Sequence, residues 1–153
     1  MLRSCKFLHA SINEALRLSP PVTGLAPRKV LPGGIDVDGV HFPEGTIIGS
    51  PIYTMHRNSA YFPQPDLFVP QRWLGLEGSV NSSQVPFCPF SVGPRSCVAK
   101  RLAIDEISIT IARILYLYEM RLDETWASKV EYPLKGWMTS SREGPFVQFK
   151  WRS

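Results

Sequence analysis

The junction at Cys97 constrains the fold of this chain more than any other feature of its sequence. Residues 89–96, PFSVGPRS, form a loop rich in glycine, proline and arginine. After the cysteine, charged residues recur at near-helical spacing over a segment that is too long for one strand, so we predict a helix over 98–120. Apolar positions cover more than one stripe of this helix, which predicts a central helix buried on most sides.

A second helix is predicted near the amino end. Apolar residues recur at helical spacing from about Ser4 to Leu18, and Pro20 and Pro21 stop the helix because proline lacks the amide hydrogen that a helix needs. Between the two helices, residues 56–89 carry prolines every few positions and show no sustained period. Loops of this length are uncommon unless they have a function, so we expect this segment to wrap around something.

Short strands complete the expected secondary structure. Asp38 and Gly39 form the two-residue turn that gives a tight hairpin its positive φ angles. At the end of the chain, apolar and polar residues alternate as they do in a half-buried strand. The predicted strands are 35–37, 40–42, 46–55 and 147–151.

The composition is that of one globular domain. Of the 153 residues, 44% are hydrophobic and 20% are charged, so a packed fold is expected. The net charge of +4 comes from scattered basic residues, so nucleic acid is not an expected partner, and an RNA-binding domain has only this charge to support it. No apolar run is long enough to span a bilayer, and the first residues lack the apolar core of a signal peptide.

The number and spacing of the cysteines exclude two common structural uses of this residue. They are odd in number and none forms a C-x-x-C pair, so neither a disulfide scaffold nor a zinc site is predicted. Taken singly, a cysteine is most often an inert buried hydrophobic residue. A cysteine nucleophile would need a histidine base. Nothing in the sequence places one of the histidines, which are His9, His41 and His56, beside Cys97.

The context of Cys97 favours an anionic sulfur. A cysteine immediately before a helix faces unpaired amides and the positive end of the helix dipole, so its thiolate form is stabilised. Gly93 and Pro94 shape a rigid turn, and Arg95 supplies a fork of donors for an external carboxylate. These features predict a cofactor that carries negative groups.

Three motifs in this chain resemble those of one family. Residues 90–97, FSVGPRSC, match the F-x-x-G-x-R-x-C signature of the cytochrome P450 haem-thiolate proteins at every fixed position. In the family's order, residues 14–17, EALR, match its E-x-x-R motif, and residues 68–73, FVPQRW, resemble its proline-to-arginine motif. The signature usually continues C-x-G; here Ala99 keeps a small residue, so the helix can still approach a haem closely.

The resemblance implies an α+β protein with the mainly α cytochrome P450 fold. Residues 1–153 would be the carboxyl-terminal, haem-binding part of that domain, with the E-x-x-R helix, small β hairpins, the haem-binding loop and the long central helix. The chain looks truncated, because the A-G-x-x-T pattern of the family's oxygen-activating helix does not occur. We therefore expect one wall of the haem pocket and one flank of the helix over 98–120 to be exposed.

The resemblance also assigns roles to single residues. Cys97 would be the axial ligand of the haem iron, and Glu14, Arg17 and Arg72 would form a buried ion network under the haem. From the residues alone, Glu14 and Arg17 would instead be an exposed pair worth roughly 0.2 to 0.5 kcal/mol. The cofactor-binding residues would be Phe90, Gly93, Arg95, Cys97, Ala99 and Arg28.

Some of these roles have equally good alternatives. Arg95 and Arg28 would bind the haem propionates, although Arg28 beside Lys29 is equally well explained as a solvated charge. Lys100 and Arg101 would help to dock an acidic partner, and a solvated helix start explains them equally well. Residues 22–26 and 137–140 resemble stretches that line substrate pockets in the family; as bare sequence they are apolar loop residues.

The function that the resemblance implies is that of a monooxygenase, which inserts one oxygen atom from O2 into an apolar organic substrate. The cofactor would be haem b, iron protoporphyrin IX, and the partners would be an NADPH-dependent reductase or another electron donor. A membrane anchor, and with it a place in the endoplasmic reticulum, would have to lie outside these residues. The alternative is a truncated, non-catalytic remnant that binds haem weakly or acts only as an interaction surface; the chain alone is expected to be inactive.

Overall fold

The structure, a computed structural model of the chain, describes residues 2–75, 80, 85–127, 134–136 and 139–152. The α-helices are α1 (Lys6–Leu18), α2 (Ile52–His56), α3 (Lys100–Leu117) and α4 (Glu124–Ala127), and the 3-10 helices are η1 (Leu2–Ser4), η2 (Pro70–Trp73) and η3 (Gly93–Arg95). The strands are β1 (Arg28–Lys29), β2 (Ile35–Val37), β3 (Val40–Phe42), β4 (Ile47–Ile48), β5 (Tyr118–Leu122), β6 (Leu134–Gly136), β7 (Ser140–Arg142) and β8 (Val147–Trp151).

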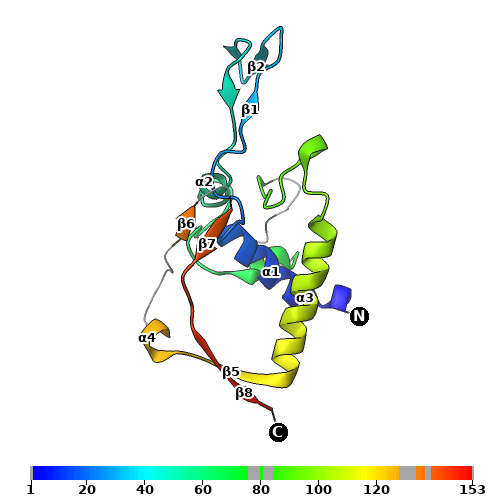
Figure 1. The fold of residues 1–153 in the computed structure, drawn as a ribbon, viewed down its shortest axis with the longest axis vertical. Helices are drawn as coiled ribbons and strands as arrows, with labels where there is room; N and C mark the ends of the chain where they lie inside the picture. Colours follow the sequence, from blue (N-terminus) through cyan, green and yellow to red (C-terminus); the bar gives the residue numbers. More distant parts are fainter. Residues whose placement is uncertain (1, 76–79, 81–84, 128–133, 137–138, 153) are drawn as a thin grey trace.

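Helix α1 lies at the centre of the molecule (Figure 1) and contacts η2, α2 and α3. Its buried apolar residues are Ala10, Ile12 and Leu16, of which Ile12 and Leu16 belong to the helical spacing that predicted the helix, whereas Phe7 and Ala15 of that spacing are exposed. The helix ends at Leu18, two residues before Pro20, as predicted. The centre of the fold is therefore built on the helix that carries the E-x-x-R residues.

The strands form four separate antiparallel pairs, which are β1–β4, β2–β3, β5–β8 and β6–β7. The hairpin β2–β3 was predicted, and its turn residues Asp38 and Gly39 have φ angles of 49° and 79°. Together with β1 and β4 it forms an arm that projects from the body of the molecule (Figure 1). Strand β7 is anchored to the segment that follows α1, because Ser140 donates from its amide and its hydroxyl to the carbonyls of Pro21 and Pro20.

The predicted strand over 46–55 is wrong in its second half. Only Ile47–Ile48 form a strand, and α2 begins after Pro51. Proline cannot donate to a strand ladder but is well suited to the start of a helix, and the Pro51 carbonyl accepts the amide of Met55 at 3.0 Å. The change from strand to helix places the face of α2 that carries His56 against the body of the protein.

The long helix is shorter than predicted, because its last expected turn is a strand. Helix α3 ends at Leu117, and Tyr118–Leu122 pair with β8 in the register Tyr118↔Trp151. The Tyr118 ring packs on Trp151 with 4.5 Å between centroids. Cross-strand aromatic pairing with a distant segment therefore overrides the local helical spacing. The predicted strand over 147–151 is confirmed as β8.

The prediction that this helix is buried on most sides is also wrong for this chain. Ser108 is the one buried residue of α3, while Leu102 is 68% exposed and Tyr116 is 80% exposed. Among the described elements, α3 contacts chiefly α1, η1 and β5, which cover one side of it. The apolar residues that gave α3 its multi-sided pattern therefore face solvent on the other side.

Residues 56–75 wrap around α1, as the prediction for segment 56–89 suggested. Within this part of the chain the only regular element that the structure describes beyond α2 is η2. Phe62 has no exposed surface and packs against His56 and Trp73, with ring centroids 6.3 and 6.2 Å away. This irregular segment thus supplies a fully buried aromatic ring.

We expect Phe62→Ala to lower the free energy of unfolding by about 3 to 5 kcal/mol, because it removes a fully buried ring and leaves a cavity. Urea denaturation followed by circular dichroism measures the change. Phe7→Ala, on the half-exposed side of α1, is the control and is expected to change stability by less than about 1 kcal/mol. Equal losses in the two variants would contradict the placement of the core.

Candidate functional site

The carboxylate of Glu14 is the centre of a buried hydrogen-bond network. Its side chain has no exposed surface, yet it accepts hydrogen bonds from three other side chains and one backbone amide. Arg17 donates to both oxygens, from Nη2 to Oε1 at 2.9 Å and from Nε to Oε2 at 3.0 Å. The remaining donors are Arg72 Nε and the Val69 amide to Oε1, each at 3.0 Å, and Trp73 Nε1 to Oε2 at 2.8 Å.

Arg17 extends the network to the backbone that surrounds it. Its Nη1 donates to the carbonyls of His56 at 2.8 Å and Pro65 at 2.7 Å, and its Nη2 donates to the Leu67 carbonyl at 3.1 Å. The guanidinium carbon also lies 5.3 Å from the centroid of the Phe62 ring. Like Glu14, Arg17 is completely buried, so the pair is not the exposed one that the spacing alone would predict.

These contacts keep Glu14 ionised. Burial by itself raises the pKa of a carboxyl group, but the hydrogen bonds from Arg17, Val69 and Trp73 and the charge of Arg17 outweigh burial, so the pKa of Glu14 lies below its ordinary value. The structure thus brings Glu14, Arg17 and Arg72 together around one charge. Two guanidinium groups against one carboxylate leave a net positive charge in the interior, which the backbone carbonyls around Arg17 help to balance.

His56 joins this network to the segment before Cys97. The ring is fully buried and stacks near Phe87, with 5.4 Å between centroids, while Phe87 packs on Trp73 at 4.5 Å. The amide of Cys88 donates to His56 Nε2 at 3.0 Å. Burial, together with the nearby charge of Arg17, lowers the pKa of His56 to about 4, so the ring is neutral at physiological pH.

The signature loop folds back on itself before α3. Gly93 has a φ of 73°, which only glycine adopts easily, and it begins the single turn of η3. The amide of Cys97 donates to the Phe90 carbonyl at 2.9 Å, and the Cys97 carbonyl accepts the amide of Lys100 at 3.3 Å. Cys97 lies three residues before α3, not immediately before it as predicted, and its side chain is exposed.

The two other cysteines differ from Cys97. Cys88 is half-buried, its Sγ donates to the Pro86 carbonyl at 3.8 Å, and burial raises the pKa of its thiol. Cys5 is exposed beside the start of α1. Among the described residues, no cluster of three or more histidine, cysteine or acidic side chains is arranged to hold a metal ion.

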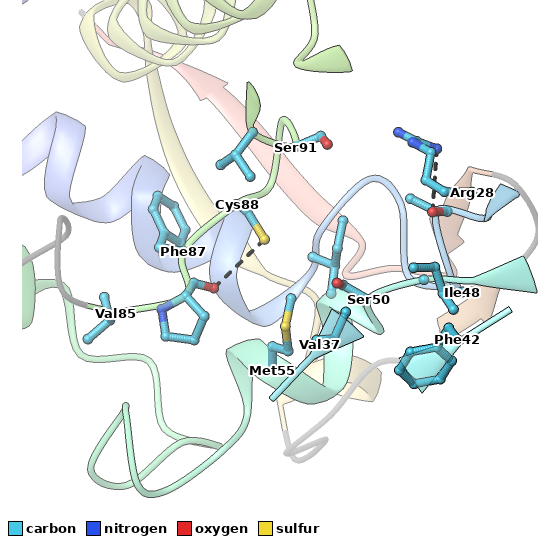
Figure 2. A pocket seen from close by; sticks show the side chains of 15 residues that line it. Arg28, Val37, Phe42, Ile48, Ser50, Met55, Val85, Phe87, Cys88 and Ser91 are labelled. Atoms are coloured by element: carbon cyan, nitrogen blue, oxygen red, sulfur yellow. Dashed lines mark hydrogen bonds between the residues drawn. The ribbon is translucent and has the colours of Figure 1, made fainter. Parts of the chain in front are cut away.

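A cavity of about 760 Å³ lies between the signature loop and the base of the arm. Figure 2 shows Arg28 and Ile48 on one side of it and Phe87 and Cys88 on the other, with Ser91 of the loop above them. The structure thus brings Arg28 to the same cavity as the signature loop. The guanidinium group of Arg28 donates to the carbonyl of Pro27 at 2.8 Å and is exposed.

Other predicted site residues lie elsewhere. Arg95, Ala99, Lys100 and Arg101 are exposed on the loop and the first turn of α3, and Phe90 is half-buried. None of these residues lines the cavity, and neither does Cys97. Of the two stretches expected to line a substrate pocket, Ser140 bonds to Pro20 and Pro21, which directly precede the other stretch, 22–26. Ala26 lines the cavity, while Trp137 and Met138 lie outside the described residues.

Comparison with known proteins identifies the family. A family model described as cytochrome P450 matches residues 1–146. The chain belongs to the cytochrome P450 family. It is 40% identical to the cytochrome P450 monooxygenase AKT7 of Alternaria alternata and 43% identical to the cytochrome P450 monooxygenase lcsN of Purpureocillium lilacinum. These alignments cover 97% of this chain in both cases but 33% and 47% of the relatives, so the chain spans about a third to a half of their length.

The fold is also that of a cytochrome P450. A crystal structure of a cytochrome P450 matches with a TM-score of 0.82 and 22% identity, covering 99% of this chain and 33% of that one. The heme domain of a cytochrome P450DA mutant matches with a TM-score of 0.79 and 20% identity, covering 95% and 32%. The α+β fold class predicted from the motifs is therefore confirmed. None of the described helices has the length and apolar character needed to cross a membrane.

Sequence reasoning missed several residues of this cytochrome P450 site. His56 was considered only as a base for Cys97, and nothing local to it indicates that it accepts a hydrogen bond from Cys88, 32 residues away. Trp73 directly follows Arg72 in the FVPQRW motif, and its indole donor was the signal that could have placed it on Glu14. Phe87 and Val69 carry no chemical signal, because their roles depend on packing and on the backbone.

We expect Glu14→Ala to destabilise the chain by about 3 to 5 kcal/mol, because it leaves the buried guanidinium groups of Arg17 and Arg72 without their counter-charge. Chemical denaturation measures the loss. Glu143→Ala is the matched control: Glu143 pairs with Lys135 at 3.9 Å, both side chains are more than half exposed, and a change below about 1 kcal/mol is expected. A similar small effect in both variants would argue against the network.

We also expect the stability of the chain to fall as the pH drops from about 6.5 to about 4. The folded state keeps His56 neutral down to its pKa of about 4, whereas the unfolded chain protonates this group near 6.5, so the unfolded state binds more protons in this window. The contribution is fully present above the upper value, and its loss amounts to about 3 kcal/mol. Urea midpoints measured between these pH values test it, and His56→Gln should flatten the slope.

Proposed function

We propose that this chain is the haem-binding part of a cytochrome P450 monooxygenase, with Cys97 as the axial ligand of the iron. The observation that carries the proposal is the position of Cys97: an exposed thiol at the end of a loop whose sequence matches the family signature. In this family a bound haem supplies the oxygen chemistry, and thiolate ligation favours cleavage of the O–O bond. Membership of the family implies a haem, and we propose haem b as the specific cofactor.

The residues around Cys97 fit a large, flat and mostly apolar group. Val92 is 70% exposed, Val98 next to Cys97 is fully exposed, and Leu102 in the first turn of α3 is 68% exposed, so apolar side chains close to the thiol in the sequence are open to solvent. Exposed apolar patches of this kind mark binding surfaces. The Cys97 side chain is exposed, so no hydrocarbon wall closes off the sulfur, and its thiolate would be the ligand that this chain supplies to the iron.

The arginines of the site would hold the negative edge of this group. Arg28 lines the same cavity as Ser91 and Val92 of the signature loop, and this shared cavity supports a role for its guanidinium group in binding a carboxylate of the cofactor. Arg95 belongs to the loop itself and is exposed. Phe90 is half-buried behind the loop, where its ring would exclude water from the thiolate side, and Ala99 keeps the start of the helix small.

The remaining parts of the proposal concern the whole protein. The relatives from Alternaria alternata and Purpureocillium lilacinum are named monooxygenases, and from them we propose the insertion of one oxygen atom from O2 into an apolar organic substrate, with electrons from an NADPH-dependent reductase. Lys100 and Arg101 are exposed next to the ligand, as a docking surface for an acidic partner requires. Glu14, Arg17 and Arg72, which are connected to the segment before Cys97 through His56, would brace the loop and take no part in the chemistry.

A second candidate function is a remnant that binds haem weakly or serves as an interaction surface without turnover. The exposed apolar side of α3 favours it, because exposed apolar surface marks sites of protein interaction. Incubation with a reductase, NADPH and apolar substrates separates the two: product formation excludes the remnant, and haem uptake without product supports it for this chain.

We expect the haem-loaded, reduced chain to give the strongly red-shifted Soret band of thiolate ligation when carbon monoxide is added. Cys97→Ser should abolish the band, since serine does not supply the thiolate. Cys5→Ser and Cys88→Ser are matched controls that should keep it. The ligand assignment is wrong if all three variants behave alike.

A further inference from the structure

One hydrogen bond connects the segment before Cys97 to the earlier part of the chain. Within the described residues, the Cys88 amide donating to His56 Nε2 at 3.0 Å is the one hydrogen bond between residues 85–99 and any residue before them. From Cys88 the backbone continues through two turns, because the Cys88 carbonyl accepts the Ser91 amide and the Phe90 carbonyl accepts the Cys97 amide, both at 2.9 Å. The position of His56 therefore bears on the position of Cys97.

His56 is itself fixed by the buried charges. Arg17 donates to its carbonyl at 2.8 Å, and α2 ends at this residue, so the backbone of His56 is tied to the guanidinium group that also holds Glu14. The side chain has no exposed surface. A rigid backbone and a buried ring leave the Nε2 lone pair with a fixed direction.

We infer that His56 is a positioning residue: its neutral ring carries the proton on Nδ1, accepts the Cys88 amide through Nε2, and so holds the loop that carries Cys97 against the Glu14–Arg17 network. The part of this inference that concerns the haem rests on the proposed function. The part that concerns the ring and the loop does not.

The tautomer of His56 follows from the group that donates to it, which is the Cys88 amide. A backbone amide can only donate, so Nε2 must present a lone pair, and a neutral imidazole then carries its single proton on Nδ1. A charged ring has no lone pair on either nitrogen, and it would also place a second positive charge beside Arg17. In the described part of the chain, Nδ1 has no hydrogen-bond partner, so Nε2 is the nitrogen that orients the ring.

A simple packing role for His56 makes the opposite prediction about substitutions. The ring contacts Phe62 and Phe87, so a residue needed only to fill space would be replaced best by phenylalanine. Glutamine packs less well than a ring, but its side-chain oxygen can occupy the position of Nε2 and accept the Cys88 amide. The order of the two variants therefore separates hydrogen bonding from packing.

The first test uses the chain without haem. Long-range 15N–1H correlation spectra at pH 7 should show the His56 ring protonated on Nδ1, and the Cys88 amide should be protected from hydrogen exchange. His56→Phe should speed exchange of this amide on the order of fivefold to tenfold, the effect of losing one hydrogen bond, and His56→Gln should restore most of the protection. His41→Phe, on the exposed arm, is the control and should change neither result.

The inference is overturned if the ring carries its proton on Nε2, or if the Cys88 amide is protected equally in His56→Phe and the unsubstituted chain. It is also overturned if His56→Phe protects the amide better than His56→Gln, because this order is the one that packing predicts.

The second test uses the haem-loaded chain and reads the carbon monoxide spectrum. His56→Phe should lower the share of protein that shows the red-shifted band, and His56→Gln should retain it, because only glutamine keeps the loop in place. Retention of the band in Cys97→Ser would refute the proposed function and leave the first test standing. Loss of the band in Cys97→Ser, combined with equal spectra for both His56 variants, would refute only the role of His56 toward the haem.

Discussion

The buried carboxylate of Glu14 is the constraint on which the rest of the described structure depends. A carboxylate without solvent is tolerated only when its oxygens are fully paired, and here the donors come from α1, from residue 69 and from η2. Meeting this requirement forces segment 56–73 to pass around α1 at hydrogen-bond distance. The path of the chain is thus dictated by one charge more than by regular secondary structure.

The buried network also supplies hydrogen-bond partners to backbone groups that have none in a helix or sheet. Residues 57–69 contain no helix or strand, so their carbonyls need other donors if they are buried. Arg17 provides them, since its guanidinium group bonds to the carbonyls of His56, Pro65 and Leu67 in addition to Glu14. The planar fork of an arginine fixes these directions, which a lysine would not do. The network therefore specifies one conformation for an irregular segment, and this matters more than its net contribution to stability.

What the sequence could predict was limited to local signals and to the family motifs. The Asp38-Gly39 turn and the proline stop after α1 are local, and both predictions were correct. Helix α2 has five residues, too few to show a period, and strand β5 exists because it pairs with β8, about 25 residues further along. The motifs brought Glu14, Arg17 and Arg72 together as a group. Nothing in the sequence indicated the link between His56 and Cys88, because neither residue belongs to the fixed positions of a motif.

The loop that carries Cys97 is held to the body of the protein in one place and leaves apolar side chains exposed in others, and this difference has a consequence for binding. The loop is tied to the body through His56, whereas Val92, Val98 and Leu102, which are close to Cys97 in the sequence, are exposed to solvent. Burial of each such side chain contributes about 1.5 to 3 kcal/mol, and in this chain that contribution is available only when something covers the loop. A ligand that binds the folded state alone raises its stability. Under the proposed function, cofactor binding and completion of the fold around Cys97 would therefore be the same event, with the Glu14 network providing the one side that is already in place.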